Sequence, residues 1–227
     1  MTAPAPPSSH DLAIAVFCGA SPGNDPVYIQ AAESVARAIA QAGKTLVYGG
    51  GTKGLMGKVA SSALEHGGRV HGVIPSAFLS AEAPDRGNAV KPNEIETVVK
   101  TMHERKKLMS DLSGAFIGLP GGYGTLEEVA EMTTWSQLAI ISKPVVLLNI
   151  NGFYTPLRNF IEGAISAGFI PPKNRNFLVF LDPTPSPEFD WGRAALEKIR
   201  EWKAMGSGGA EPFSFEWEEG RPREEVL

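Results

Sequence analysis

Short runs of apolar residues recur along the chain, and turn-forming residues follow them. The first run, LAIAVF at 12–17, is apolar at every position, and glycine, serine, proline and asparagine come next. Runs of this length that are apolar on both faces are typical of buried strands. They predict strands at 12–17, 45–48, 69–74, 115–119, 144–150 and 177–181.

Longer segments lie between these runs and predict helices. The clearest begins after Asp25, a good N-cap residue, with Pro26 in its first turn, and ends at Gly43. Helices are expected at 26–42, 55–66, 94–112, 126–140, 153–167 and 187–203. The segment 75–93 contains three prolines and is expected to be irregular, as a flexible lid would be.

Strands that alternate with helices predict an α/β fold with a parallel sheet covered by helices on both faces. No internal repeat or linker interrupts 12–203, so a single Rossmann-like domain is expected there. The Pro-, Ser- and Ala-rich residues 1–11 are expected to form a disordered arm. Residues 204–227 are expected to form an acidic, flexible tail whose removal leaves activity intact.

Composition narrows the classes of protein. Hydrophobic residues make up 43% of the 227, enough for a sizeable core. No window approaches 18 uncharged apolar residues, and the N-terminus lacks the basic and apolar regions of a secretory signal. Cys18 is the only cysteine, so an intrachain disulfide is excluded. A reducing compartment, and hence a cytoplasmic location, is expected.

The charge is unevenly distributed. The tail 204–227 holds six of the 25 acidic residues and two of the 21 basic ones, so the rest of the chain has 19 of each. A neutral body argues against a general nucleic-acid-binding surface, which needs an excess of Lys and Arg. The balanced charge does not exclude selective binding of one small anion.

Glycines cluster after the predicted strand 45–48. Gly49, Gly51 and Gly54 match the dinucleotide-binding pattern G-x-G-x-x-G, and Gly50 lies among them. That pattern also needs an acidic residue near the end of the following strand, which here ends in GVIP. A nicotinamide-dependent dehydrogenase is therefore disfavoured, and neither glycine loop matches the Walker pattern.

A second glycine loop, PGGYGTLEE at 120–128, follows the strand 115–119. Glycines let backbone amides approach an anion, and the start of a helix supplies free N–H groups. The hydroxyl of Thr125 is a further donor. The alternative is that these glycines only form tight turns, but two such loops at the ends of two strands favour a phosphate or nucleotide site.

Glu128 has two interpretations. Thr125 and Glu128 have the spacing of a capping box, with Thr125 as N-cap. Alternatively, Glu128 lies one turn beyond the phosphate site, at ribose distance. A carboxylate there would hold sugar hydroxyls, stabilise an oxocarbenium-like centre or orient a water molecule.

The segment MHERKK at 102–107 carries a basic cluster. Lys107 is expected to face solvent, whereas Arg105 and Lys106 either share that face or pair with a phosphate or with Glu128. The four histidines show no metal-ligand spacing, so neither a metal nor a cofactor is expected. Cys18 is expected to be a small buried residue and not a nucleophile.

The motif PGGYGTLEE, together with MHERK, GGGTKGLMG and VFCGAS, closely resembles the LOG (Lonely Guy) family of cytokinin riboside 5′-monophosphate phosphoribohydrolases. The resemblance covers about 14–181. It implies a Rossmann-like hydrolase that cleaves the N-glycosidic bond of an adenine-type nucleoside 5′-monophosphate into free base and ribose 5-phosphate.

The resemblance also assigns residues. It implies that Arg105 and Glu128 are the catalytic pair. Substrate-binding residues are expected mainly in the second glycine loop, with a few from neighbouring segments: Lys106, Gly122, Tyr123, Gly124, Thr125, Leu126, Glu127, Thr134, Gly50 and Gly51. It further implies a homodimer, to which the segment 98–109 is expected to contribute.

The chain departs from the family at 75–93, where typical members carry a substrate-binding glutamate that cannot be assigned here. Two alternatives remain: an AMP nucleosidase without a cytokinin role, and a protein that binds a nucleotide or molybdopterin cofactor without cleaving it. Retention of both Arg105 and Glu128 favours the enzyme.

Overall fold

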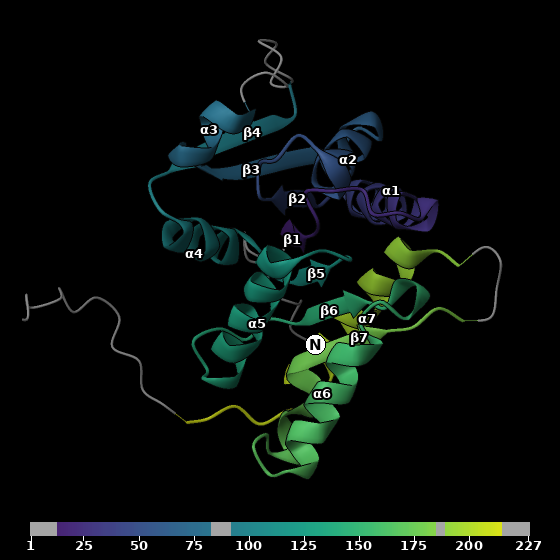
Figure 1. Ribbon diagram of the computed structural model, residues 1–227, viewed down its shortest axis with the longest axis vertical. Helices are drawn as coiled ribbons and strands as arrows, with labels where there is room; N and C mark the ends of the chain where they lie inside the picture. Colours follow the sequence, from purple (N-terminus) through teal and green to yellow (C-terminus); the bar gives the residue numbers. More distant parts are fainter. Residues whose placement is uncertain (1–12, 83–91, 185–188, 215–227) are drawn as a thin grey trace, which may run out of the picture.

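Seven parallel strands form one sheet in the computed structural model, which describes residues 13–82, 92–184 and 189–214 (Figure 1). The strand order is β4-β3-β2-β1-β5-β6-β7, and the order reverses at β1, whose neighbours are β2 and β5. The strands are β1 (Ala13–Phe17), β2 (Thr45–Tyr48), β3 (Arg69–Pro75), β4 (Glu94–Val99), β5 (Phe116–Gly118), β6 (Val145–Leu148) and β7 (Leu178–Leu181).

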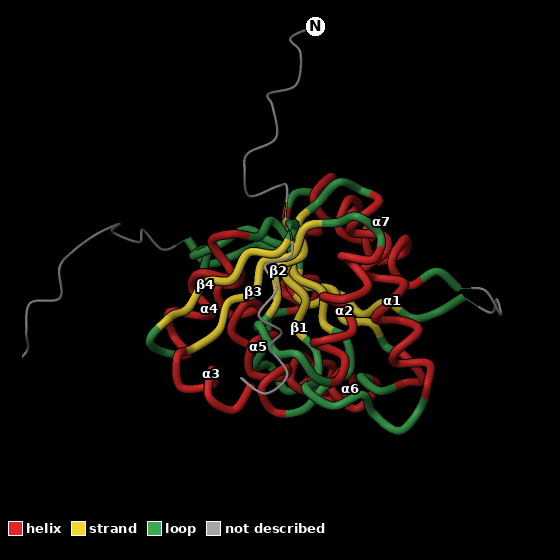
Figure 2. Tube along the Cα trace, turned by 90° about the horizontal axis from the view of Figure 1, so that it is seen from above, coloured by secondary structure: helices red, strands yellow, loops and turns green. Residues whose placement is uncertain are grey.

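Helices cover both faces of this sheet, as the alternating pattern predicts (Figure 2). The helices are α1 (Pro26–Gln41), α2 (Gly54–Glu65), α3 (Ser76–Glu82), α4 (Met102–Leu112), α5 (Tyr123–Gln137), α6 (Thr155–Ser166) and α7 (Trp191–Ala204), with short 3-10 turns η3 (Ile150–Gly152), η4 (Pro172–Phe177) and η5 (Ser207–Gly209). Asp25 caps α1, since its side chain accepts from the Val27 N–H at 2.9 Å.

Two hydrophobic cores lie on opposite faces of the sheet. One joins the strands to α1, α2 and α7, and is centred on side chains such as Ile14 and Ile39. The other joins them to α4 and α5, with Phe17, Phe116 and Met132 fully buried. Alternate residues of β1 enter different cores, which explains why its sequence is apolar throughout.

The predicted helix 94–112 is wrong over its first part. Residues 94–99 form β4, which pairs with β3 at the edge of the sheet, and the helix starts only at Met102. Thr101 caps α4 by accepting from the Glu104 N–H at 3.1 Å. Val98, Met102 and Met109 have the spacing of one helical face and so predict a single helix, but Val98 belongs to the strand and the two methionines to α4.

The segment 75–93 is also more regular than predicted, because α3 occupies its first part; residues 83–91 lie outside the described part of the chain. The predicted arm 1–11 lies outside it as well, as does 215–227 of the predicted tail. None of the described helices is long and apolar enough to cross a membrane. Within the same ranges, no group of three or more His, Cys, Asp or Glu side chains could hold a metal ion.

Candidate active site

A cavity of about 700 Å³ opens at the carboxyl end of the sheet, where β1 and β5 end side by side. In open α/β sheets this switch point in the strand order is where ligands bind. Its walls come from the loop after β1, the second glycine loop and the starts of α2, α4 and α5. The cavity therefore combines segments that are far apart in sequence.

The second glycine loop supplies backbone donors to this cavity. Gly122 is the N-cap of α5, and the first bond of the helix runs from the Leu126 N–H to the Gly122 carbonyl at 3.1 Å. The N–H groups of Tyr123, Gly124 and Thr125 therefore precede the first helical bond and have no partner within the helix. Gly122, Gly124 and Thr125 line the cavity, so its wall suits an anion.

The capping-box interpretation of Glu128 is wrong. Helix α5 begins at Tyr123, three residues earlier than predicted, so Thr125 lies within its first turn and is not its N-cap. The Thr125 side chain packs against the backbone of Gly121, where an added Cβ would lie 2.2 Å from its hydroxyl oxygen. Glu128 follows one turn later and also lines the cavity.

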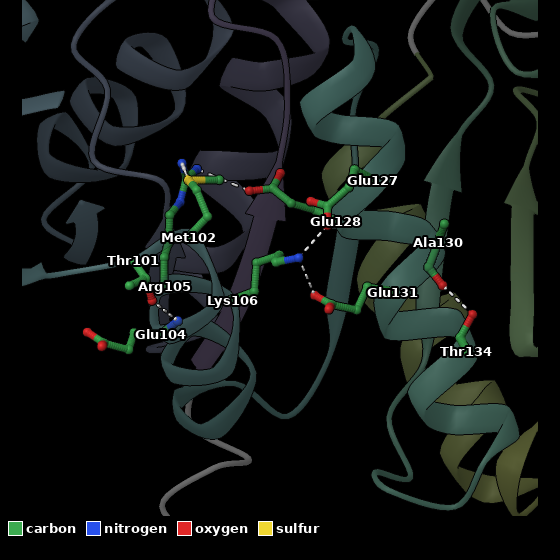
Figure 3. Close-up of polar contacts among 10 residues, drawn as sticks. All are labelled: Thr101, Met102, Glu104, Arg105, Lys106, Glu127, Glu128, Ala130, Glu131 and Thr134. Atoms are coloured by element: carbon green, nitrogen blue, oxygen red, sulfur yellow. Dashed lines mark hydrogen bonds and ion pairs between the residues drawn. The ribbon is translucent and has the colours of Figure 1, made fainter. Parts of the chain in front are cut away.

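Glu128 forms a buried ion pair with Arg105 from α4 (Figure 3). The Arg105 Nη2 lies 3.1 Å from the Glu128 Oε1, and the two residues are only 7% and 6% exposed. Arg105 Nη1 points to the sulfur of Met102 at 3.8 Å. The Arg105 Nε is buried and has no hydrogen-bond partner among the described residues.

The first glycine loop makes room for this pair. A Cβ on Gly49 would lie 2.0 Å from the Arg105 Nη2. Gly49 is therefore needed for close approach of the guanidinium, a role that its place in a G-x-G-x-x-G pattern does not suggest. Gly50 and Gly51 do not line the cavity, although the Met56 side chain that packs on Gly51 does.

Burial raises the pKa of Glu128 to about 7, although the neighbouring Arg105 acts in the opposite direction and Glu127 adds to the rise. The carboxyl group is therefore poised to exchange a proton near neutral pH. Cys18, at the end of β1, also lines the cavity. Burial raises the pKa of its thiol, which keeps it neutral and unsuited to nucleophilic attack.

Lys106 and several other predicted binding residues lie outside the cavity. Lys106 forms ion pairs with Glu127 and, at 2.9 Å, with Glu131, both on α5 (Figure 3). Tyr123 is 93% exposed, and Leu126 is exposed too. Thr134 lies further along α5, where its hydroxyl donates to the Ala130 carbonyl at 2.8 Å.

The structure thus gathers five of the predicted site residues around one cavity: Arg105, Glu128, Gly122, Gly124 and Thr125. The sequence did not indicate its apolar walls, which include Tyr28, Met56, Phe78, Met102 and Phe153. These residues come from five different segments, and nothing in their local pattern distinguishes them from ordinary core residues.

The sequence is similar to a known protein family. A family model described as "Possible lysine decarboxylase" matches residues 56–186. A cytokinin riboside 5′-monophosphate phosphoribohydrolase of Rhodococcoides fascians is 49% identical over 73% of this chain and 82% of its own length. A protein of the same name from Arabidopsis thaliana is 47% identical over 73% of this chain and 74% of its own.

Solved structures give the same fold. The Moco carrier protein from Chlamydomonas reinhardtii superposes with a TM-score of 0.59 over 86% of this chain and 99% of its own, at 21% identity. At that identity the likeness concerns the fold alone. The identity to the phosphoribohydrolases is much higher and covers most of both chains, so this chain belongs to the LOG family of cytokinin riboside 5′-monophosphate phosphoribohydrolases.

Proposed function

We propose that the protein hydrolyses the N-glycosidic bond of N6-substituted adenosine 5′-monophosphates, releasing the free base and ribose 5-phosphate. The observation that carries the proposal is the buried Arg105–Glu128 pair, which lines the same cavity as the free N–H groups of α5. The names of the relatives in Rhodococcoides fascians and Arabidopsis thaliana support it.

In the proposed mechanism, the start of α5 and the Thr125 hydroxyl bind the 5′-phosphate. Binding of this remote group holds the ribose in the reactive geometry. As the bond from C1′ to the base breaks, positive charge develops on the sugar. The Glu128 carboxylate stabilises that charge and accepts a proton from the water that attacks C1′. The departing base takes up a proton from solvent and Glu128 then releases the proton that it accepted, so in sum one water molecule is divided between the two products.

Arg105 has a supporting part in this proposal. Its guanidinium fixes the orientation of the Glu128 carboxylate and opposes the rise in the pKa of that group. The apolar side chains of Met56 and Phe78 give the cavity a wall that suits an apolar substituent on the base.

Decarboxylation of lysine is a poorer fit to the same cavity. Decarboxylation through a Schiff base needs a lysine amine at the reacting centre. None of the described residues that line the cavity is a lysine, and Lys106 is engaged by two carboxylates of α5.

The activity is tested by incubating the protein with AMP and with isopentenyladenosine monophosphate and measuring free base by chromatography. We expect base from the second nucleotide at the higher kcat/KM. Release from AMP alone would support the AMP nucleosidase, and no base from either would overturn the hydrolase. The Glu128→Gln variant is the control, and its kcat is expected to fall by about 100-fold or more.

We also propose that the protein forms a homodimer in the cytoplasm. Large apolar side chains are exposed in the single chain, among them Val98 (49%) on the edge strand β4, and Tyr123 (93%) and Leu126 (43%) in the first turn of α5. Exposed apolar side chains support a surface that a partner covers. Light scattering is expected to give about twice the chain mass of 24.2 kDa. A mass of one chain would contradict the dimer.

A further inference from the structure

Three hydrogen bonds fix the backbone where β5 enters the second glycine loop. The Leu119 N–H donates to the Phe17 carbonyl at 2.9 Å, and the Pro120 carbonyl accepts from the Gly19 N–H at 3.1 Å. Between them, the Leu119 carbonyl accepts from the hydroxyl of Tyr154 at 2.7 Å. Proline has no N–H, so this carbonyl is the only hydrogen-bonding group of the Leu119–Pro120 peptide unit.

A network at the ends of β6 and β7 holds Tyr154 in place. The Tyr154 N–H donates to the Asn149 Oδ1 at 2.7 Å, and the Asn149 Nδ2 donates to the Asp182 Oδ1 at 2.7 Å. Arg158 completes the network with a contact of 2.7 Å to the other oxygen of Asp182. Burial acts to raise the pKa of Asp182, but the bonds from Asn149 and Arg158 bring it below its ordinary value, so it stays an ionised acceptor.

The ring of Tyr154 has a separate packing role. It meets the ring of Phe153 edge-on, with the ring centroids 5.0 Å apart, and Phe153 lines the cavity. Tyr154 is 6% exposed, and Leu119 is fully buried. Tyr154→Phe keeps this ring contact and removes the bond from the hydroxyl to the Leu119 carbonyl.

We propose that Tyr154 is a positioning residue for phosphate binding. Its hydroxyl holds the Leu119–Pro120 peptide so that the free N–H groups at the start of α5 face the 5′-phosphate. This inference rests on the proposed function, because it deepens the phosphate site of that reaction. Neither the glycine pattern nor the family motif of the loop includes Tyr154, which lies 26 residues after Glu128, the last residue of that motif.

The physical reason is the polarity of the peptide unit. A carbonyl oxygen turned toward an anion repels it, whereas N–H groups attract it. Without the Tyr154 hydroxyl, the buried Leu119 carbonyl has no donor from that side chain. Rotation of the Leu119–Pro120 peptide would let this carbonyl accept from water in the cavity instead. The rotation displaces the glycine loop just before the N–H groups that would bind phosphate.

The test is the affinity of Tyr154→Phe for ribose 5-phosphate and for inorganic phosphate, measured by calorimetry in the full chain. We expect both dissociation constants to rise about tenfold, as one lost hydrogen bond to a buried group produces. For the nucleotide substrate, KM is expected to rise by a similar factor, with kcat changed less than about threefold, because Arg105 and Glu128 keep their contacts.

Ser136→Ala is the matched control. The Ser136 hydroxyl is buried and also donates to a backbone carbonyl, that of Lys143 at 3.1 Å, at the far end of α5. This variant is expected to lower the melting temperature and leave both phosphate affinities unchanged. A folded Tyr154→Phe that binds both anions as the wild type does would overturn the role of Tyr154 and leave the proposed function standing.

Asp182→Ala provides a second variant at a more exposed position. It removes the acceptor that holds Asn149 and is expected to weaken ribose 5-phosphate binding about threefold. If Tyr154→Phe does not fold, Asp182→Ala decides: an unchanged affinity of Asp182→Ala for ribose 5-phosphate would overturn the inference. A wild type that binds neither anion and releases no base would overturn the inference and the proposed function together.

Discussion

Glu128 owes its protonation behaviour to its position between α4 and α5. Nearly complete removal from water favours its neutral form, while the guanidinium of Arg105 favours the charged one. Burial prevails, so the group can change its protonation state near pH 7. An exposed glutamate at the same place in the motif would be fully ionised there.

The pH dependence of turnover follows from this balance. Because the ionised carboxylate is the form that acts, kcat/KM is expected to rise with pH across a midpoint of about 7. Below the midpoint it should fall by about tenfold for each pH unit. Steady-state rates measured from pH 5 to 9 check this. The affinity for ribose 5-phosphate is measured over the same pH range, so that the effect of phosphate ionisation can be separated from that of Glu128. Rates that fall as pH rises through 7 would show that Glu128 acts as an acid instead.

Gly49 is a second position at which one atom decides the geometry. In Gly49→Ala the new Cβ would lie 2.0 Å from the Arg105 Nη2, so the guanidinium must move. A shift of this size in a catalytic group is expected to lower kcat/KM by about 100-fold while the protein stays folded. Kinetics and circular dichroism of the variant test this.

Gly163→Ala serves as the comparison for Gly49→Ala. Gly163 lies inside α6, where an added Cβ would point into open space, at least 4 Å from every described residue outside its own helical turns. Its substitution is expected to stabilise the protein by about 0.5–1 kcal/mol and to leave kcat/KM unchanged. If Gly49→Ala has the same activity as Gly163→Ala, then Arg105 does not depend on the space beside Gly49.

At the scale of elements, the site depends on how α4 packs against α5. Arg105 and Lys106 are adjacent in sequence yet meet different residues of α5: Glu128 beside the cavity, and Glu127 with Glu131 outside it. Successive residues of a helix point about 100° apart. Arg105 therefore pairs with Glu128 beside the cavity, whereas Lys106 pairs with α5 outside it and stabilises the contact between the two helices. Lys107, the next residue, pairs with Asp111 on its own helix.

Lys106→Met is expected to loosen this packing. It leaves Glu127 and Glu131 without their shared cation, and the free energy of unfolding should fall by about 1–3 kcal/mol. In a chain of this length that corresponds to a drop in melting temperature of about 2–4 °C per kcal/mol. Lys107→Met removes an exposed pair at 2.6 Å and is expected to change stability by less than about 0.5 kcal/mol. Equal effects in the two variants would contradict this role of Lys106.

At the scale of the whole molecule, the folded body extends past the boundary predicted at residue 203. The Asn176 Nδ2 donates to the Gly208 carbonyl at 2.8 Å, and the Phe213 N–H donates to the Gln137 carbonyl at 2.9 Å. Ala210 is buried, and Gly208 packs so closely on Trp202 that a Cβ would lie 2.4 Å from its ring. Residues 205–214 therefore belong with the body.

Two truncations separate this part of the chain from the rest. A chain that ends after Ser214 is expected to keep the wild-type melting temperature and kcat/KM. A chain that ends after Lys203 loses the contacts of Gly208, Ala210 and Phe213, so its free energy of unfolding should fall by about 2–4 kcal/mol. Its kcat/KM per folded molecule should stay close to the wild-type value, because these residues lie outside the cavity lining. Equal stability of the two truncated chains would contradict these contacts.

The sequence by itself determined six of the seven strands and the glycine loop that follows β5. Doubly buried parallel strands must be apolar at every position, so β1, β2, β5 and β6 are visible as short apolar runs. The edge strand β4 is not predicted, because two glutamates interrupt its apolar residues and Val98 lies at a helical spacing from Met102 and Met109. Its strand character comes from pairing with β3, which no local pattern reveals.

Only the tertiary structure decided how the site is built. The motif places Arg105 and Glu128 in the site, but their 3.1 Å contact depends on the packing of two helices and on the space beside Gly49. The start of α5 at Tyr123 likewise decided that Thr125 lies inside the helix and does not cap it. The bond from Tyr154 to Leu119 joins residues 35 positions apart. Contacts of this kind depend on which strands become neighbours, and hydrophobic periodicity along the chain records burial but not neighbours.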